Sequence, residues 1–180
     1  MRSVDKIPNS ASKAACEMVI ASYRSAILSS TGIAVASARA GNVICGGDWS
    51  IDRLIPDAVR AWQTGRVLDV RRPQAIRPWQ HVLEPQVGYL ILAHRLWEEP
   101  SLHGPYNFGP ETGEAATVRE VVEIARTVYG NAEVHYGDES EGPRESERLA
   151  LEIAKVRALG ICSRISLLDA VSRTMVWYRE

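Results

Sequence analysis

Hydrophobic positions recur along the chain at two spacings, and their alternation predicts a mixed α/β fold. Apolar residues three and four positions apart indicate helices, whereas short apolar runs bounded by glycine indicate strands. Helices are expected over about 11–30, 54–63, 82–97, 117–130, 152–159 and 167–178. Strands are expected over 33–38, 67–70, 106–109 and 132–137, with polar loops at 40–50 and 71–82.

Two of these helices begin with a recognisable capping pattern. Thr117 is followed three residues later by Glu120, and Ser166 by Asp169. In such a capping box the hydroxyl accepts from a free amide of the first turn, and the acidic side chain reaches back to the cap residue. We therefore expect well-defined starts for both helices.

The apolar run 33–38 has the form of a buried parallel strand, and such a strand needs neighbours. Only 32 residues precede it, and none of them predicts a strand. The first helix and this strand are therefore expected to be the end of a larger sheet. Without the rest of that sheet, an apolar face and a bare strand edge should promote self-association.

Composition narrows the class of protein. The 180 residues suit one domain or a large part of one, and 46% hydrophobic with 24% charged residues is ordinary for a globular protein. A net charge of −1 gives no reason to expect nucleic acid or an anionic membrane as a partner. Three cysteines without CxxC spacing, and no signal-peptide pattern, favour a reduced cytoplasmic setting. No cluster has the spacing of metal ligands, so no metal is expected.

Asn9 and Lys13 are four residues apart at the start of the first helix, so they share one helix face. Three interpretations are open: the pair does chemistry, it is a relic of chemistry, or it is an ordinary helix start. Asparagine is a common residue at helix N-termini, which favours the last of these.

Five strings give this chain a family resemblance. They are "SASKAACE" (10–17), "ARAGNVICGGDW" (38–49), "RLIPD" (53–57), "RPWQHVLEP" (77–85) and "YNFGP" (106–110). Together they resemble the extended short-chain dehydrogenase/reductase family, and within it the CDP-glucose 4,6-dehydratases. The resemblance runs from about residue 8 to the end but covers only the C-terminal half of that family. It implies the last part of a Rossmann-like NAD-binding domain over 1–48 and mainly a nucleotide-sugar-binding domain over 49–180.

The resemblance implies NAD as cofactor and conversion of CDP-glucose to CDP-4-keto-6-deoxyglucose as the parent reaction. No GxGxxG turn occurs in these 180 residues, and the family's acidic catalytic residues lie outside them. The family also has a Tyr-x-x-x-Lys pair where this chain has Asn9 and Lys13. A neutral amide cannot replace the phenolate as a base. The chain is therefore expected to be inactive alone.

The resemblance also assigns binding residues. Lys13, Ala40 and Asn42 correspond to cofactor-binding positions, and Asn42 also to a substrate position. Arg53 and Arg77 would face the diphosphate, because guanidinium groups bind phosphate bidentately. The remaining implied substrate-binding residues are Leu54, Val70 and Asn107.

Simpler interpretations stand beside these assignments. Asn42 and Asn107 could be turn residues, and an isolated arginine is usually just solvated. Trp79 and Trp49 could stack on sugar or base, but core packing is the simpler expectation. His81 is expected to orient its loop rather than to transfer a proton.

The chain also departs from the family pattern in three places. Cys45 stands where a glycine is usual, and the loop would be strained if that position needs a positive φ angle. Arg144 replaces a histidine in "PRES", and "LGICSR" (159–164) lacks the usual tryptophan and proline. These changes affect the rim of the substrate domain.

Two further functions are considered. The chain could be a non-catalytic nucleotide-sugar-binding or dimerisation subunit, acting as a homodimer or with a partner that supplies the missing half. It could also be part of an epimerase or dehydratase that acts on another nucleotide sugar.

Overall fold

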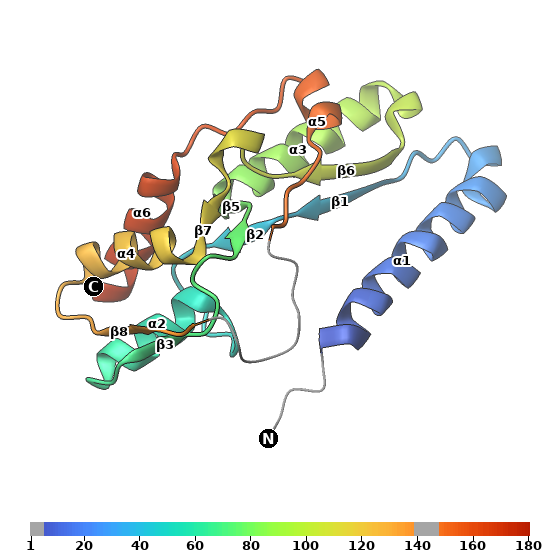
Figure 1. Ribbon diagram of the computed structural model, residues 1–180. Helices are drawn as coiled ribbons and strands as arrows, with labels where there is room; N and C mark the ends of the chain where they lie inside the picture. The colour runs from blue at the N-terminus through green and yellow to red at the C-terminus, as the bar shows by residue number, and fades with distance from the viewer. Residues whose placement is uncertain (1–5, 139–147) are drawn as a thin grey trace.

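The computed structural model describes residues 6–138 and 148–180, and it has a mixed α/β architecture (Figure 1). The α-helices are α1 (Lys6–Ala26), α2 (Leu54–Gln63), α3 (Leu83–Glu98), α4 (Val118–Tyr129), α5 (Ala154–Ala158) and α6 (Leu167–Arg179). The strands are β1 (Ala36–Ala40), β2 (Asn42–Ile44), β3 (Leu68–Val70), β4 (Ile76–Arg77), β5 (Trp79–His81), β6 (Gly104–Phe108), β7 (Ala116–Thr117) and β8 (Val134–Tyr136). Short 3-10 turns lie at Leu28–Ser30, Pro100–Leu102 and Thr112–Glu114.

Within the described residues the strands form four pairs. β1 pairs with β6, β2 with β5 and β3 with β8, all in parallel, while β4 and β7 pair antiparallel. α3 lies between β5 and β6 along the chain, and these two strands belong to different pairs. This arrangement follows the expected alternation of strands and helices.

The predicted helices and strands are present, and the helix over 54–63 has the predicted bounds. The two segments expected to be loops contain the strands that sequence reasoning missed, namely β2, β4 and β5. β7, at the start of α4, was also missed. Each has only two or three residues, too few to show an alternating pattern, and each exists because a distant segment pairs with it.

Two hydrophobic clusters make up the core. The larger joins α2, α4 and α6, and its fully buried side chains include Val59, Val121 and Met175. The smaller packs α3 and α5 on β6 around Phe108 and Leu92.

α1 stands apart from the other helices, and from its C-terminal end the chain turns back into β1 (Figure 1). Glu17 links the two elements, because its carboxylate accepts from the Ser37 hydroxyl at 3.0 Å and lies 3.8 Å from Arg39. Met18 and Tyr23 are 74% and 56% exposed. This agrees with the expected uncovered face on the first helix.

The predicted parallel pairing of the first strand is confirmed, but its predicted burial is not. Ala38 and Arg39 in β1 are exposed, and β1 pairs only with β6 among the described residues. The reason is that a second neighbouring strand, which would cover it, is absent from the described part of the chain.

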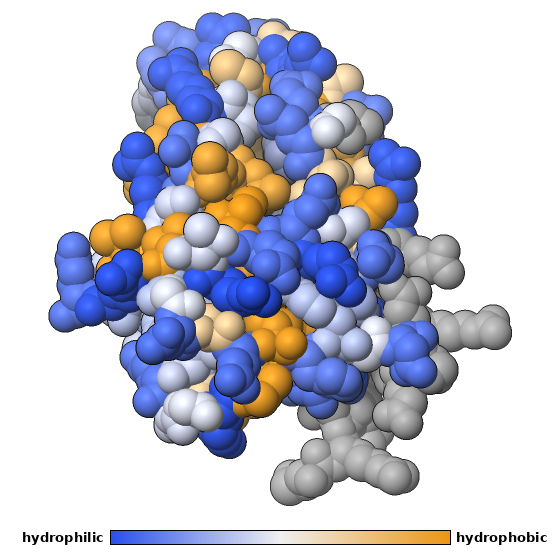
Figure 2. Space-filling model, turned by 60° about the vertical axis from the view of Figure 1, so that its left-hand side comes forward, coloured by the Kyte–Doolittle hydropathy of each residue, from blue (hydrophilic) through white to orange (hydrophobic). Residues whose placement is uncertain are grey.

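Polar side chains cover most of the face turned forward in Figure 2, with apolar residues gathered in separate patches. Exposed apolar side chains elsewhere in the fold include Leu90, Trp97, Leu168 and Trp177. No helix of the described residues is long and apolar enough to cross a membrane.

The capping box predicted for α4 is confirmed. The Glu120 amide donates to the Thr117 hydroxyl at 3.1 Å, and the Glu120 carboxylate accepts from the Thr117 amide at 2.6 Å. At α6, Ser166 accepts from the Asp169 amide at 3.1 Å. Backbone and hydroxyl hydrogen bonds from Thr117 lower the pKa of Glu120.

Replacing Thr117 by alanine is expected to cost about 1 kcal/mol of stability at pH 7. Because the pKa of Glu120 is lowered on folding, its carboxylate contributes fully above the unfolded value of about 4.3 and stops contributing as pH falls through the folded value. Urea unfolding at pH 7 and at pH 3 measures both effects. Thr127→Ala, on the same helix, is the control and should change little. An equal cost at both pH values would contradict the role of the carboxylate.

Candidate functional site

The carboxyl ends of several strands meet at Gly41 and Asn42. The Gly41 amide donates to the Phe108 carbonyl at 3.1 Å, and the Asn42 amide donates to the Pro78 carbonyl at 2.9 Å. The buried Gln80 side chain donates to the same Phe108 carbonyl at 3.0 Å. A Cβ at Gly41 would lie 2.6 Å from the Pro78 oxygen, so this close approach requires glycine. Ligands of α/β sheets commonly bind at such an edge.

Three predicted site residues come together at this edge. Ala40 ends β1, and Asn42 begins β2 opposite Trp79 in the β2–β5 register. Arg77 precedes Pro78, whose carbonyl receives the Asn42 amide. The Arg77 side chain is half-buried and donates to the Ile76 carbonyl at 2.9 Å. The backbones of these three residues therefore meet at this edge.

Three other predicted residues lie on α2 and β3. Arg53 is exposed and occupies the N-cap position of α2, with an extended backbone. Leu54 is the first residue of that helix and packs partly against the larger core cluster. Val70 ends β3 and is only 4% exposed, within that cluster.

The Asn107 side chain is used by the chain itself. It lies on β6, opposite Arg39, and its amide donates to the Glu152 carbonyl at 2.9 Å. This bond ties β6 to the segment before α5. The structural interpretation of Asn107 is therefore the better supported one.

Asn9 and Lys13 both belong to α1, so their predicted i, i+4 relation holds for the backbone. Lys13 is exposed, and the structure describes only the backbone of Asn9. Toward NAD, the chain would contribute the cation of Lys13, the backbone at Ala40 and the amide of Asn42. These groups do not fit the whole cofactor, because the sequence has no glycine-rich turn to hold its pyrophosphate.

Cys45 does not strain the loop that follows β2. Of the described residues other than glycine, Asp52 has a positive φ, at 61°, and Cys45 does not. Burial, with a smaller contribution from Asp48, raises the pKa of the Cys45 thiol, which keeps it protonated at neutral pH. The expected strain at this departure from the family pattern is therefore absent.

The aromatic and histidine side chains mostly have structural roles. Trp79 is 6% exposed and its indole N–H donates to the Ala116 carbonyl at 3.1 Å, which supports core packing. Trp49 is 48% exposed and meets the ring of Tyr178 edge-on at 5.2 Å, so the core packing expected for it is wrong. His81 accepts from the Leu83 amide at 3.3 Å. Burial, and then the Arg173 charge, lower the pKa of His81, so a neutral ring orients the start of α3.

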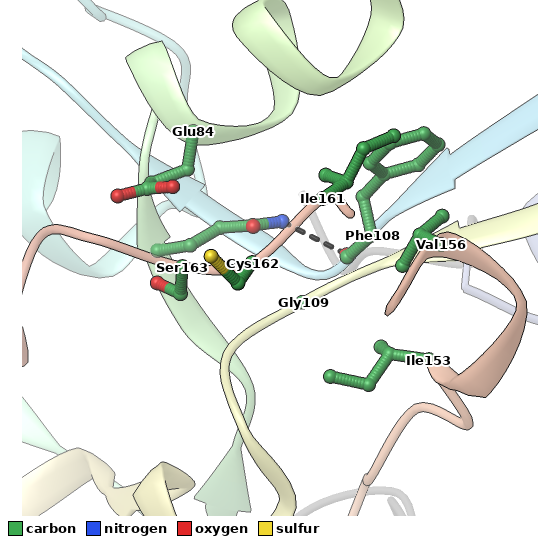
Figure 3. A pocket seen from close by; sticks show the side chains of 9 residues that line it. Glu84, Phe108, Gly109, Ile153, Val156, Ile161, Cys162 and Ser163 are labelled. Carbon is green, nitrogen blue, oxygen red and sulfur yellow. Dashed lines mark hydrogen bonds between the residues drawn. The ribbon is translucent and has the colours of Figure 1, made fainter. Parts of the chain in front are cut away.

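Sequence reasoning did not single out Glu84. One of its carboxylate oxygens accepts from the Arg164 and Ile165 amides at 2.8 and 2.5 Å, which fastens the segment before α6 to α3. Glu84 and Gln80 line a cavity of about 20 Å³, room for about one water, together with Cys162 and Ser163 (Figure 3). Both belong to the quoted string "RPWQHVLEP", so the signal was present in the sequence.

The two C-terminal departures have different outcomes. In "LGICSR", Ile161 is buried in the smaller core cluster against Phe108, so the altered segment still packs. Arg144 lies outside the described residues. Within the described part of the chain, no group of three or more His, Cys, Asp or Glu side chains could hold a metal ion.

Two curated proteins are similar in sequence to this chain. A CDP-glucose 4,6-dehydratase from Salmonella typhimurium is 37% identical over 179 residues, which cover 96% of this chain and 50% of that protein. A trifunctional UDP-glucose 4,6-dehydratase, UDP-4-keto-6-deoxy-D-glucose 3,5-epimerase and UDP-4-keto-L-rhamnose reductase from Arabidopsis thaliana is 24% identical over 180 residues, 96% of this chain and 25% of that protein. No model of a known protein family matches the chain.

Solved structures agree with the fold. A UDP-glucose 4-epimerase from Thermus thermophilus, in complex with NAD, is 26% identical with a TM-score of 0.74, over 96% of this chain and 54% of the other. A UDP-N-acetylglucosamine 4-epimerase from Methanobrevibacter ruminantium, in complex with UDP-N-acetylmuramic acid, is 19% identical with a TM-score of 0.75, over 96% and 53%. The chain therefore spans about half the length of these two proteins and of the Salmonella dehydratase, and a quarter of the Arabidopsis protein.

Proposed function

We propose that this chain, which belongs to the extended short-chain dehydrogenase/reductase family of nucleotide-sugar dehydratases and epimerases, is the substrate-binding part of a CDP-glucose 4,6-dehydratase. The observation that supports this most is the 37% identity with such a dehydratase over 96% of the chain. In this proposal, 1–48 are the end of an NAD-binding domain and 49–180 mainly bind the nucleotide sugar.

Each binding residue has a role in this proposal. Asn42 donates to a sugar oxygen, because it lies at the edge where strand ends meet. Arg77 binds the diphosphate beside it, and Arg53 binds the same group from the start of α2. Leu54, partly buried at the start of α2, lines the side of the nucleobase, whereas Val70 is left out of the ligand set because it is only 4% exposed in the core. Asn107 is left out of the ligand set, because its amide is already bonded to Glu152.

The chain is proposed to be inactive on its own. Asn9 stands at the family's tyrosine position, and a neutral amide cannot take the proton that leaves as the sugar hydroxyl is oxidised. The residues that would contact NAD do not complete a site for it. When bound, NAD would supply hydride transfer, and this part of the protein would orient the sugar. The thiols of Cys16, Cys45 and Cys162 are free, which is consistent with a reducing, cytoplasmic setting.

Titration calorimetry of the purified chain with CDP-glucose, UDP-glucose and NAD tests the proposal. CDP-glucose should bind, UDP-glucose should bind less tightly, NAD should not bind, and no 4-keto product should form. Sedimentation of the same sample should show a dimer, since the apolar face of α1 is exposed. If UDP-glucose bound more tightly than CDP-glucose, the parent enzyme would act on another nucleotide sugar. If neither CDP-glucose nor UDP-glucose bound, the proposal would be overturned.

Replacing Arg77 by alanine is expected to weaken CDP-glucose binding about tenfold, the loss of one charge-assisted contact to the diphosphate. Calorimetry measures the change directly. The control is Arg95→Ala, because Arg95 is an exposed residue of α3 whose ion pair with Glu98 is 3.9 Å long. Equal affinities of the Arg77 variant and the parent would contradict the assigned role.

A further inference from the structure

The loop 45–53 connects β2 to α2 and ends at Arg53, so its conformation decides where that guanidinium lies. Side chains from two helices hold the loop by its backbone carbonyls. Arg60 reaches it from α2, and Tyr178 reaches it from α6. Sequence reasoning singled out neither residue.

Arg60 bonds two successive carbonyls of the loop. Its terminal nitrogens donate to the Trp49 and Ser50 oxygens, each at 2.9 Å. One of these nitrogens also pairs with the Asp57 carboxylate one turn away on α2, which orients the guanidinium. Three acceptors around one planar group match the fixed fork of arginine, and a lysine ammonium cannot reproduce that geometry.

The other end of the loop is held by α6. The Tyr178 hydroxyl lies 2.5 Å from the Asp48 carbonyl and 3.4 Å from the Cys45 carbonyl. Gly46 packs against the indole of Trp177. The loop is therefore fastened at its start by α6 and in its middle by Arg60.

The contacts that hold the loop matter most for its last turn, which ends at Arg53. Asp52 has a φ of 61°, a left-handed conformation that aspartate adopts more easily than most residues but that still costs free energy. Arg53 follows at once with an extended backbone. The Asp48 pKa is lowered by hydrogen bonds from Ser50 and, more weakly, by the Arg53 and Arg60 charges, so its carboxylate is ionised and attracts Arg53.

We propose that Arg60, oriented by Asp57, is a positioning residue that holds 48–53 so that Arg53 meets the diphosphate of the nucleotide sugar. This inference rests on the proposed function. Arg60 touches no ligand, since its guanidinium is used by the loop and by Asp57. Binding of the diphosphate part of the ligand should therefore depend on Arg60, whereas binding of the nucleoside part should not.

The test compares Arg60→Lys with the parent chain for two ligands. Calorimetry gives the affinity for CDP-glucose, and an NMR titration at millimolar concentration gives that for cytidine, which has no phosphate. We expect Arg60→Lys to weaken CDP-glucose about tenfold and to leave cytidine unchanged. Arg66→Lys is the matched control, because Arg66 lies just after α2 and its guanidinium donates to the Thr64 hydroxyl at 2.8 Å, away from the loop.

A second background separates positioning from folding. In Arg53→Ala, Arg60→Lys should have no further effect on CDP-glucose, because the group that it positions is gone. The positioning role would be overturned if Arg60→Lys weakened binding of both CDP-glucose and cytidine. It would also be overturned if Arg60→Lys weakened CDP-glucose binding as much in Arg53→Ala as in the parent. Either result would leave the proposed function intact. If the parent chain binds neither ligand, the proposed function itself fails, and this inference fails with it.

Discussion

Replacing Trp79 by alanine is expected to lower the free energy of unfolding by about 3–5 kcal/mol. Trp79 is 6% exposed in the larger core cluster, so its removal leaves a large cavity. It also leaves the Ala116 carbonyl without its indole donor. Because Trp79 stands opposite Asn42 in the β2–β5 pair, the same change should loosen the candidate site.

Urea unfolding followed by circular dichroism measures the Trp79 effect. The matched control is Trp97→Ala, since Trp97 on α3 is 87% exposed and its removal should change stability by less than about 0.5 kcal/mol. Trp79→Phe keeps most of the buried ring and should cost much less than alanine. If Trp79→Ala and Trp97→Ala were equally mild, Trp79 would be available for a ligand rather than committed to the core.

The second large effect is expected at Gly46. A Cβ at this position would lie 2.3 Å from Cγ and 2.6 Å from Cβ of Trp177. These atoms are at the root of the side chain, so a small rotation of the indole cannot remove the overlap. Gly46→Ala should therefore destabilise the protein by about 1–3 kcal/mol, although the backbone of Gly46 needs no positive φ.

Thermal or urea unfolding of Gly46→Ala checks this prediction. Gly113→Ala is the control, because nothing lies within 4 Å of its added methyl group. Trp177→Ala removes the contacts of 2.3 and 2.4 Å to Cγ and Cδ2 and leaves only the 2.6 Å contact to Cβ, so in the double variant the two changes should cost less together than their sum. Strictly additive costs would mean that the contact between Gly46 and Trp177 does not limit this position.

The elements that the sequence predicted well depend on nearby residues. The helix of 54–63 follows from its own apolar spacing, and the start of α4 from Thr117 and Glu120. Asn42, Arg53 and Arg77 were predicted as site residues because they lie in long strings that resemble the family. Local patterns and matched strings can be read from one segment without knowing what it touches.

Other features could not be predicted from a single segment, because they depend on contacts between distant parts of the chain. β2 and β5 are strands only because Asn42 pairs with Trp79, and two- or three-residue strands have no pattern of their own. Asn107 matches a binding position in sequence, yet its amide is bonded to Glu152, 45 residues away. A side chain has one set of hydrogen-bonding groups, and the folded neighbours decide how they are used.

The sequence alone therefore predicted the α/β class, the helix starts and the family resemblance, since these depend on spacing and on strings within single segments. The tertiary structure decided which side chains are available for binding and which are committed to the fold. Tyr178 is separated by 130 residues from Asp48, and its hydroxyl meets that carbonyl only because α6 packs beside β2. Packing of distant segments, driven by burial of their apolar faces, brings such groups into hydrogen-bonding range.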